Sequence, residues 1–207
     1  MKVMLINGSP HEKGCTYTAL CEAEKVLAEN GIETEIFWIG GNPIPGCIGC
    51  GACRMLGKCY VDTDTVNTFT EAAKSADGFI FGSPVHYAAA GGAISAFMDR
   101  AFYSAGGALR GKPAAAVVSC RRGGASAAFD QLNKYFSINC MPIVSSNYWN
   151  QVHGNNPDEV MQDEEGMQTV RVMAQNMAWL LKCIELGKEN GVVFEEKESR
   201  VYTNFIR

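Results

Sequence analysis

No apolar run in this sequence approaches the ~20 residues that a membrane-spanning helix needs, which predicts that the chain does not cross a membrane. A hydrophobic signal segment is also missing, because the first two residues lead directly into a short strand-like run. We therefore expect a cytoplasmic protein. An excess of positive charge is absent as well: the formal net charge is −4, which gives no electrostatic case for nucleic-acid binding.

Several phosphate-handling and catalytic signatures are missing. The dinucleotide fingerprint G-x-G-x-x-G does not occur. Gly14 is followed by Cys15-Thr16, so the Lys of a Walker A loop is absent and a nucleoside triphosphate is disfavoured. The Cys-x5-Arg loop of a phosphatase fails because Cys21, and not Arg, stands six residues after Cys15. The histidines are scattered, which argues against a histidine metal site or a Ser-His-Asp arrangement.

What the sequence does contain is an alternation of short apolar runs and amphipathic stretches, typical of parallel strands joined by helices. With 207 residues, 47% of them hydrophobic, one full core is expected. We predict strands over residues 3–6, 32–39, 79–81, 114–119 and 141–145, with 32–39 near a sheet edge. We predict helices over residues 16–29, 63–76, 93–103, 127–138 and 164–190. Loops are expected around Gly106-Gly107 and over residues 147–163.

This pattern predicts an α/β domain with a doubly wound parallel sheet of about five strands, whose ligand crevice lies beyond the carboxyl ends of the strands. The domain is expected to span residues 1–190 and to carry a cysteine-rich loop at 40–60. Residues 191–207 form a charged tail ending in Phe205-Ile206, which we expect to pack on a neighbouring subunit.

The first strand leads into a loop rich in glycine and hydroxyls and then into a helix, which is an arrangement suited to anions. Backbone N–H groups and the helix dipole favour a phosphate there, and hydroxyls of Ser9, Thr16 and Thr18 can add donors. Without an obligatory cation, a terminal monophosphate such as that of FMN fits best. An ordinary strand-to-helix turn is the alternative. Cys15 lies near the helix N-terminus, where we expect its pKa to fall.

Clustered cysteines are the sharpest local signal. The spacing C-x2-C-x2-C-x5-C places four thiols within one glycine-rich loop: Cys47, Cys50, Cys53 and Cys59. Bacterial ferredoxins use the similar C-x2-C-x2-C-x3-C-P. Three interpretations stay open, namely a 4Fe–4S cluster, a cysteine loop without metal, and zinc. A structural disulfide is disfavoured in a reducing compartment.

Two motifs resemble one known family. Gly8-Ser9-Pro10 with Gly14-x-Thr16, and Gly82-Ser83-Pro84-Val85-x-Tyr87 followed by Phe97-Met98-Asp99-Arg100, are similar to motifs of the flavodoxin-like NAD(P)H-dependent FMN reductases. Cys15 departs from the Asn that is usual in that family. The cysteine spacing resembles that of its iron–sulfur flavoprotein branch. The resemblance covers the chain from Met1 to about Tyr148.

The resemblance implies the flavodoxin-like strand order 2-1-3-4-5 and three loops around FMN. The implied cofactor-binding residues are Ser9, Pro10, Gly14, Cys15, Thr16, Thr18, Pro84, Val85, His86, Tyr87, Ser119, Arg121, Gly123 and Gly124, and the implied cluster ligands are Cys47, Cys50, Cys53 and Cys59. Arg121 and its neighbour Arg122 would meet flavin carbonyls or the phosphates of a nicotinamide nucleotide, or are solvated surface arginines. Asp99 and Arg100 are expected to serve structure and subunit contacts.

The leading functional hypothesis is an FMN-dependent oxidoreductase that takes electrons from NAD(P)H, with no catalytic side chain because the flavin carries the chemistry. Its implied acceptors are quinones, nitro- and azo-aromatics, free flavin or a ferredoxin-like protein. The first alternative is an electron carrier that relays electrons between a ferredoxin-like partner and FMN through a 4Fe–4S cluster. The second is a flavin-binding module without turnover. A homodimer or homotetramer is expected.

Overall fold

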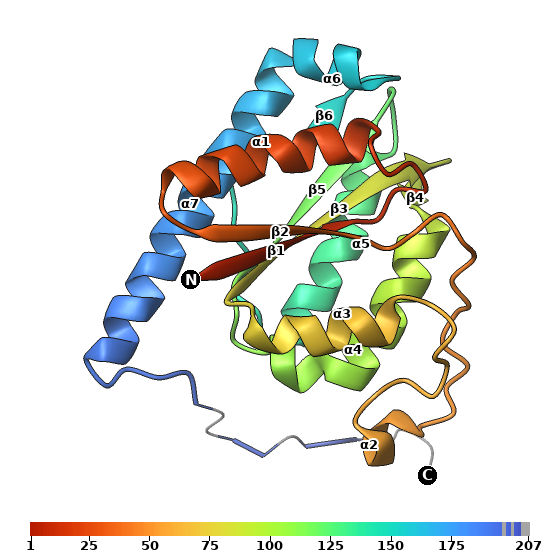
Figure 1. The fold of residues 1–207 in the computed structure, drawn as a ribbon, viewed down its shortest axis with the longest axis vertical. Helices are drawn as coiled ribbons and strands as arrows, with labels where there is room; N and C mark the ends of the chain where they lie inside the picture. The colour runs from red at the N-terminus through yellow and green to blue at the C-terminus, as the bar shows by residue number, and fades with distance from the viewer. Residues whose placement is uncertain (196–197, 200, 204–207) are drawn as a thin grey trace.

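The computed structural model describes residues 1–195, 198–199 and 201–203, and it places one sheet between two groups of helices (Figure 1). The strands run in the order β2-β1-β3-β5-β6, and each neighbouring pair along this path is parallel. They are β1 (Lys2–Asn7), β2 (Glu33–Trp38), β3 (Gly78–His86), β5 (Ala114–Cys120) and β6 (Gln151–His153). The short β4 (Ala89–Ala90) folds back on β3 as an antiparallel hairpin. Without β4, this is the predicted order 2-1-3-4-5, so the fold prediction is confirmed.

Helices cover both faces of the sheet (Figure 1). One face carries α1 (Cys15–Glu29), α6 (Pro157–Gln162) and α7 (Glu164–Glu189). The other carries α3 (Val66–Ala72) with its 3-10 extension η1 (Ala73–Ser75), α4 (Gly92–Leu109) and α5 (Ala125–Ile138). The small α2 (Cys53–Leu56) lies away from the sheet, on the long segment between β2 and α3. Among the described helices, none is long and apolar enough to span a membrane.

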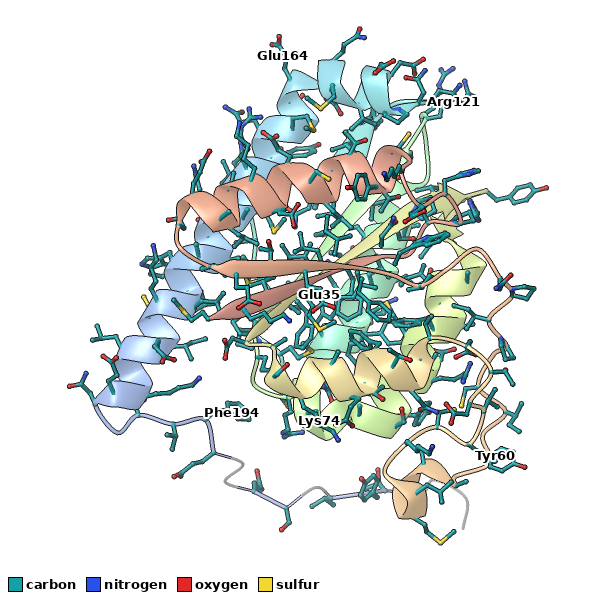
Figure 2. All side chains as sticks on the ribbon, viewed as in Figure 1. Glu35, Tyr60, Lys74, Arg121, Glu164 and Phe194 are labelled. Carbon is teal, nitrogen blue, oxygen red and sulfur yellow. The ribbon has the colours of Figure 1, made fainter. Side chains whose placement is uncertain are left out.

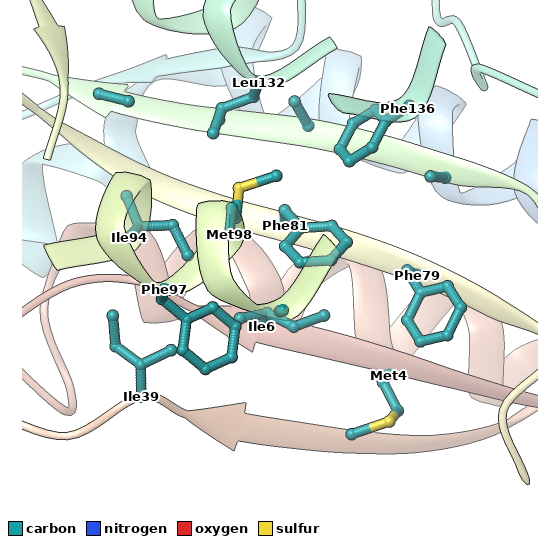
Figure 3. Packing of buried hydrophobic residues seen from close by; sticks show 14 of the residues in the cluster. Met4, Ile6, Ile39, Phe79, Phe81, Ile94, Phe97, Met98, Leu132 and Phe136 are labelled. Carbon is teal, nitrogen blue, oxygen red and sulfur yellow. The ribbon is translucent and has the colours of Figure 1, made fainter. Parts of the chain in front are cut away.

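Two hydrophobic cores form, one on each face of the sheet, because successive side chains of a strand point to opposite faces. In β1, Met4 and Ile6 face α4, whereas Val3 and Leu5 pack beneath α1 and α7. Figure 3 shows the hydrophobic cluster that contains Met4 and Ile6, in which phenylalanine rings from β3, α4 and α5 pack between the sheet and these helices. The Phe81 ring lies 5.4 Å from that of Phe136, centroid to centroid. Because both faces are covered, the central strands tolerate almost no polar residues.

The predicted fifth strand was wrong. Residues 141–145 contribute only an isolated bridge between Ile143 and Ala114, and the fifth parallel strand is β6, inside the segment predicted to be a loop. β6 has three residues and buries only Val152 fully, so it lacks the apolar run that marks the other strands. The α6 helix in the same segment was missed for a similar reason, because Val160 is its one buried residue.

The helix α4 is longer than predicted, and it continues through the two glycines that were expected to flank a loop. It bends at Ala105, whose φ of −133° is not helical. The last turn is held from outside, because Asn139 donates to the Gly106 carbonyl at 2.9 Å and Leu109 is fully buried. Tertiary packing therefore overrides the low helix propensity of glycine.

The first residues of the tail, 192–194, pack against the same chain. The carbonyl of Gly187 accepts the Val192 N–H at 2.8 Å, and a Cβ on Gly111 would lie 2.7 Å from the Phe194 ring. Figure 2 labels Phe194 in this position below the sheet. Phe205-Ile206, which we expected to need cover from another subunit, lie outside the described residues.

Candidate functional site

The predicted phosphate loop connects β1 to α1 and lies directly against the middle of β3. Gly8 donates its N–H to the Gly82 carbonyl at 2.9 Å. A Cβ on Gly8 would come within 2.7 Å of that carbonyl oxygen and of Ile94. Glycine is therefore required here for close approach, and the approach fixes where the loop begins.

Hydrogen bonds within the loop hold it in shape without a ligand. The buried Asn7 side chain donates to the Glu12 carbonyl at 2.8 Å and accepts from the Ser9 N–H at 3.1 Å. Ser9 Oγ accepts the His11 N–H at 3.1 Å, which leaves the Ser9 hydroxyl proton available for a ligand. Thr18 Oγ1 donates back to the Gly14 carbonyl at 3.2 Å, so this predicted donor is engaged inside the first turn of α1.

The amino end of α1 is open to an anion. Gly14 is its N-cap, no side chain caps the helix, and no acidic residue stands in the first turn. The first N–H groups of α1 are thus not satisfied by a capping side chain, and the helix dipole favours negative charge at this point. This is the local arrangement predicted for a phosphate.

Cys15 differs from expectation. Burial raises the pKa of its thiol. A hydrogen bond from its own backbone N–H lowers the pKa by less than burial raises it, and the nearby Glu159 carboxylate raises the pKa further. The Sγ atom lies 3.7 Å from the Gly154 carbonyl oxygen, an acceptor that also favours the protonated thiol. The prediction that the helix N-terminus would lower this pKa was wrong, because desolvation outweighs the dipole.

The other two predicted loops meet the first at the carboxyl ends of the strands. Thr16 on α1 and Ser119 at the end of β5 share a buried hydroxyl–hydroxyl bond of 2.8 Å. Gly124 has φ +91°, and a Cβ there would lie 2.8 Å from Val85 and from Ala88 of the β3–β4 hairpin. The structure therefore brings the predicted residues of all three loops to one edge.

The loop residues differ in exposure. Pro84 and Val85 are half-buried, whereas His86 and Tyr87 are exposed. Tyr87 has φ 56°, an uncommon backbone conformation for a bulky residue, and its side chain is fully exposed. Arg121 is exposed on the loop after β5, at the same end of the molecule as the start of α1 (Figure 2).

The four clustered cysteines line a single cavity of about 500 Å³ between the 46–61 segment and α4. Cys47 and Cys50 are exposed, and Cys53 and Cys59 are partly buried. Cys53 Sγ lies 3.6 Å from the Tyr103 carbonyl oxygen on α4. Among the described residues, no three Cys, His, Asp or Glu side chains are arranged to hold a metal ion.

A buried arginine of α4 reaches this cysteine loop. Arg100 is 2% exposed, and its Nε donates to Cys59 Sγ at 3.2 Å. Its Nη2 donates to the Val61 carbonyl at 2.7 Å, and its Nη1 donates to the Pro45 carbonyl and forms an ion pair with Asp64. Burial, the largest influence, lowers the pKa of Arg100, but the bonds to Asp64 and Cys59 outweigh it and the pKa is raised.

A family model described as NADPH-dependent FMN reductase matches residues 1–156 of this chain. The chain belongs to the NADPH-dependent FMN reductase family. Within the family it resembles iron–sulfur flavoproteins. It is 34% identical to one from Methanocaldococcus jannaschii over 193 residues, which cover 89% of this chain and 100% of that protein. It is 29% identical to another from Methanosarcina thermophila over 194 residues, covering 91% and 100%.

Solved structures agree on the fold of this family member. An archaeal flavodoxin superposes with a TM-score of 0.60 at 14% identity, covering 88% of this chain and 99% of that one. An NADH:FMN oxidoreductase in its apo form superposes with a TM-score of 0.64 at 17% identity, covering 86% and 89%. The predictions of a flavodoxin-like fold and of a flavoprotein oxidoreductase are confirmed.

The sequence indicated a structural role for Arg100, which the structure confirms, but it did not reveal the contact of Arg100 with the cysteine loop. Arg100 was expected to serve structure and subunit contacts, and Asp64 was not singled out at all. The available signal was the position of a charged residue on the buried stripe of α4, beside Phe97 and Ala101. Arginine is almost never fully buried unless it is paired, so a partner had to exist.

Proposed function

We propose that the protein binds FMN at the three loops and a 4Fe–4S cluster at Cys47, Cys50, Cys53 and Cys59, and that it passes electrons between a ferredoxin-like protein and FMN. The observation that carries this proposal is the single cavity lined by all four thiols. Full-length similarity to iron–sulfur flavoproteins supports it.

For FMN, the free N–H groups at the start of α1 and the Ser9 hydroxyl would hold the terminal phosphate. The half-buried Pro84 and Val85 would border the ring, and the loop from Ser119 to Gly124 would close on it. The bound flavin supplies both two-electron hydride chemistry and one-electron transfer. The chain's own contribution is to anchor the phosphate, orient the ring and exclude water.

For the cluster, the kind of donor and the glycine-rich backbone suit the group, although no three of the described thiols are yet arranged to hold a metal. Four thiols in one loop are the ligand set of a 4Fe–4S centre, which supplies one-electron transfer when bound. Gly49, Gly51 and Gly57 have φ between 66° and 71°, conformations that residues with a Cβ rarely adopt. These glycines let the backbone turn tightly between the cysteines. Zinc, or a cysteine loop without metal, would give a different metal content.

A second candidate is an NAD(P)H-dependent FMN reductase that passes electrons to quinones, nitro- or azo-aromatics, or free flavin. The description of the matching family supports it. The exposed Arg121 and Arg122 beside the FMN loops are suitably placed for the phosphates of a nicotinamide nucleotide.

One anaerobic experiment separates these functions. The FMN-loaded protein is mixed separately with NADH, NADPH and a reduced bacterial ferredoxin, and the flavin absorbance is followed in a stopped-flow instrument. Rapid bleaching by ferredoxin alone supports the relay, and rapid bleaching by NAD(P)H alone supports the reductase. If none of them bleaches the flavin, a binding module without turnover is the better account.

The variant Cys50→Ser tests whether the thiols take part. It should retain FMN, because Cys50 is exposed on a loop distinct from the flavin loops. Under the relay proposal, bleaching by ferredoxin slows strongly in this variant. An unchanged ferredoxin rate in Cys50→Ser would contradict the proposed route through the cysteine loop.

A homodimer or homotetramer remains part of the proposal. Apolar side chains around the cysteine loop are exposed, among them Ile48, Met55, Leu56 and Tyr60. Figure 2 places Tyr60, at the far end of the cysteine loop, well apart from Arg121. An oligomer that brings one chain's cysteine loop to another chain's flavin loops would shorten the electron path. A monomeric mass at micromolar concentration in solution would contradict this.

A further inference from the structure

The Arg100 guanidinium joins the two ends of the cysteine loop to α4. The Pro45 carbonyl, which it reaches at 3.3 Å, lies just before the first cysteine, and the Val61 carbonyl lies just after the last. Between them, the guanidinium Nε donates to Cys59 Sγ. One rigid fork thus fixes the start of the loop, its end and one of its thiols at once.

The charge of this fork is almost completely shielded from water. Arg100 has a side-chain exposure of 1% and Asp64 one of 7%, and the two form an ion pair. Asp64 also accepts the Val66 N–H at 3.0 Å, which ties the pair to the start of α3. A buried cation therefore lies in hydrogen-bond contact with Cys59, and a single buried carboxylate balances it.

We propose that Arg100 is a positioning residue for the iron–sulfur centre: it holds the cysteine loop closed before the cluster assembles, and it raises the cluster's reduction potential through its charge and its N–H···S bond, with Asp64 as the opposing charge. This inference rests on the proposed function. Hydrogen bonds to sulfur and nearby positive charge stabilise the more negative, reduced form of a cluster. Removing Arg100 should lower the potential, and removing the charge of Asp64 should raise it.

The test compares Arg100→Gln, Arg100→Lys and Asp64→Asn with wild type. Asp64→Asn keeps a side-chain oxygen for the Val66 N–H, and Arg100→Lys keeps the charge but loses the fork. The matched controls are Arg171→Gln and Glu22→Gln. Each control removes one partner of the ion pair between Arg171 Nη1 on α7 and Glu22 Oε1 on α1, which lie 2.7 Å apart. Like the Arg100 pair it joins an arginine to a carboxylate, but it is more exposed to water.

The first readout is the midpoint potential of the cluster in an EPR-monitored redox titration under argon. The potential should fall in Arg100→Gln, stay closer to wild type in Arg100→Lys and rise in Asp64→Asn. The controls should not shift it. Shifts of the same sign in Arg100→Gln and Asp64→Asn, or none in either, would overturn the electronic part of the inference.

The second readout needs no cluster. Arg54 and Lys58 are exposed within the loop, and trypsin can cleave after either of them. In iron-free protein, Arg100→Gln and Arg100→Lys should be cut there at least about tenfold faster than wild type, because hydrogen bonds from a charged group are lost. Cluster affinity after reconstitution should fall about 10- to 100-fold in Arg100→Gln. Equal cleavage rates would overturn the positioning role.

The two readouts separate the inference from the function beneath it. If anaerobic wild type holds no iron but the Arg100 variants are cleaved faster, the cluster proposal fails and the positioning of the loop stands. If wild type holds the cluster and the Arg100 variants match it in potential and cleavage, the function stands and this inference fails. FMN content is measured in every sample, because a variant that has lost its fold would lose FMN as well.

Discussion

The hydroxyls of Thr16 and Ser119 lie 2.8 Å apart and are both buried, so the first turn of α1 is joined directly to the end of β5. These residues are far apart in the sequence, and each was predicted separately as a ligand of FMN. In the folded chain their hydroxyls bind each other. The bond joins the loop between β1 and α1 to the loop that follows β5.

Removing this bond should weaken both stability and FMN binding. Thr16→Val keeps the shape but leaves the buried Ser119 hydroxyl without its partner, which should lower the free energy of unfolding by about 1–3 kcal/mol. FMN affinity, measured by fluorescence quenching, should fall as well. Thr68→Val on the exposed side of α3 is the control and should change neither quantity. A Thr16→Val protein as stable as wild type would contradict the coupling.

The close contact at Gly8 gives a second prediction. In Gly8→Ala, the new methyl would collide with the Gly82 carbonyl and Ile94, which should destabilise the protein by about 1–3 kcal/mol and displace the phosphate loop. Gly107 is exposed on α4 with open space where a Cβ would lie. Gly107→Ala should therefore stabilise the protein by about 0.5–1 kcal/mol. Urea unfolding of both variants measures the difference, and equal effects would contradict the packing.

The cysteines should differ in reactivity. Burial raises the pKa of Cys15 and of Cys120, so both should hold little thiolate near neutral pH. Cys47 and Cys50 are exposed. A short pulse of iodoacetamide on iron-free protein, read by peptide mass spectrometry, should label Cys47 and Cys50 well before Cys15 and Cys120. In urea all four should react at similar rates. Labelling of folded Cys15 as fast as Cys47 would contradict the shift.

Alkaline pH should expose the role of Tyr135. Burial raises the pKa of this phenol, and its 2.5 Å hydrogen bond to Asp99 raises it further. Since the folded pKa lies above the unfolded value of about 10, the stabilisation is complete below that pH and is lost as pH rises above it.

The melting temperature should therefore fall as the pH rises above about 10, and the fall should be smaller in Tyr135→Phe. Tyr148→Phe, which alters a half-exposed ring elsewhere, should keep the wild-type slope. If Tyr135→Phe melts with the same pH dependence as wild type, the phenol does not carry the effect.

The fold was predictable wherever buried strands carry unbroken apolar runs. The strands ending at Asn7 and Cys120 have both faces covered, and their sequences show it directly. β6 was not predicted, because an edge strand of three residues needs only one buried side chain, here Val152, and so shows no apolar run. The last turns of α4 were not predicted to be helical, because they contain two glycines. They are stabilised by the side-chain amide of Asn139, which is distant in the sequence.

The sequence predicted which loops would lie together, but it did not predict the electrostatics around them. Spacing singled out four cysteines, which line one cavity in the fold, and the carboxyl-end rule predicted that the loops after β1, β3 and β5 meet at one edge. The pKa of Cys15 was mispredicted, because burial raises it and because the Glu159 carboxylate and the Gly154 carbonyl, both of a distant segment, favour the protonated thiol as well. The contacts of Arg100 were not predicted either, because its partners lie at both ends of the cysteine loop and the sequence does not reveal the path of that loop.

The most direct measurement is the content of iron, acid-labile sulfide and FMN per chain in protein purified without oxygen. The account predicts about four irons, about four sulfides and one FMN. FMN with neither iron nor sulfide would contradict the central claim, and the cysteine loop would then have to act without a cluster.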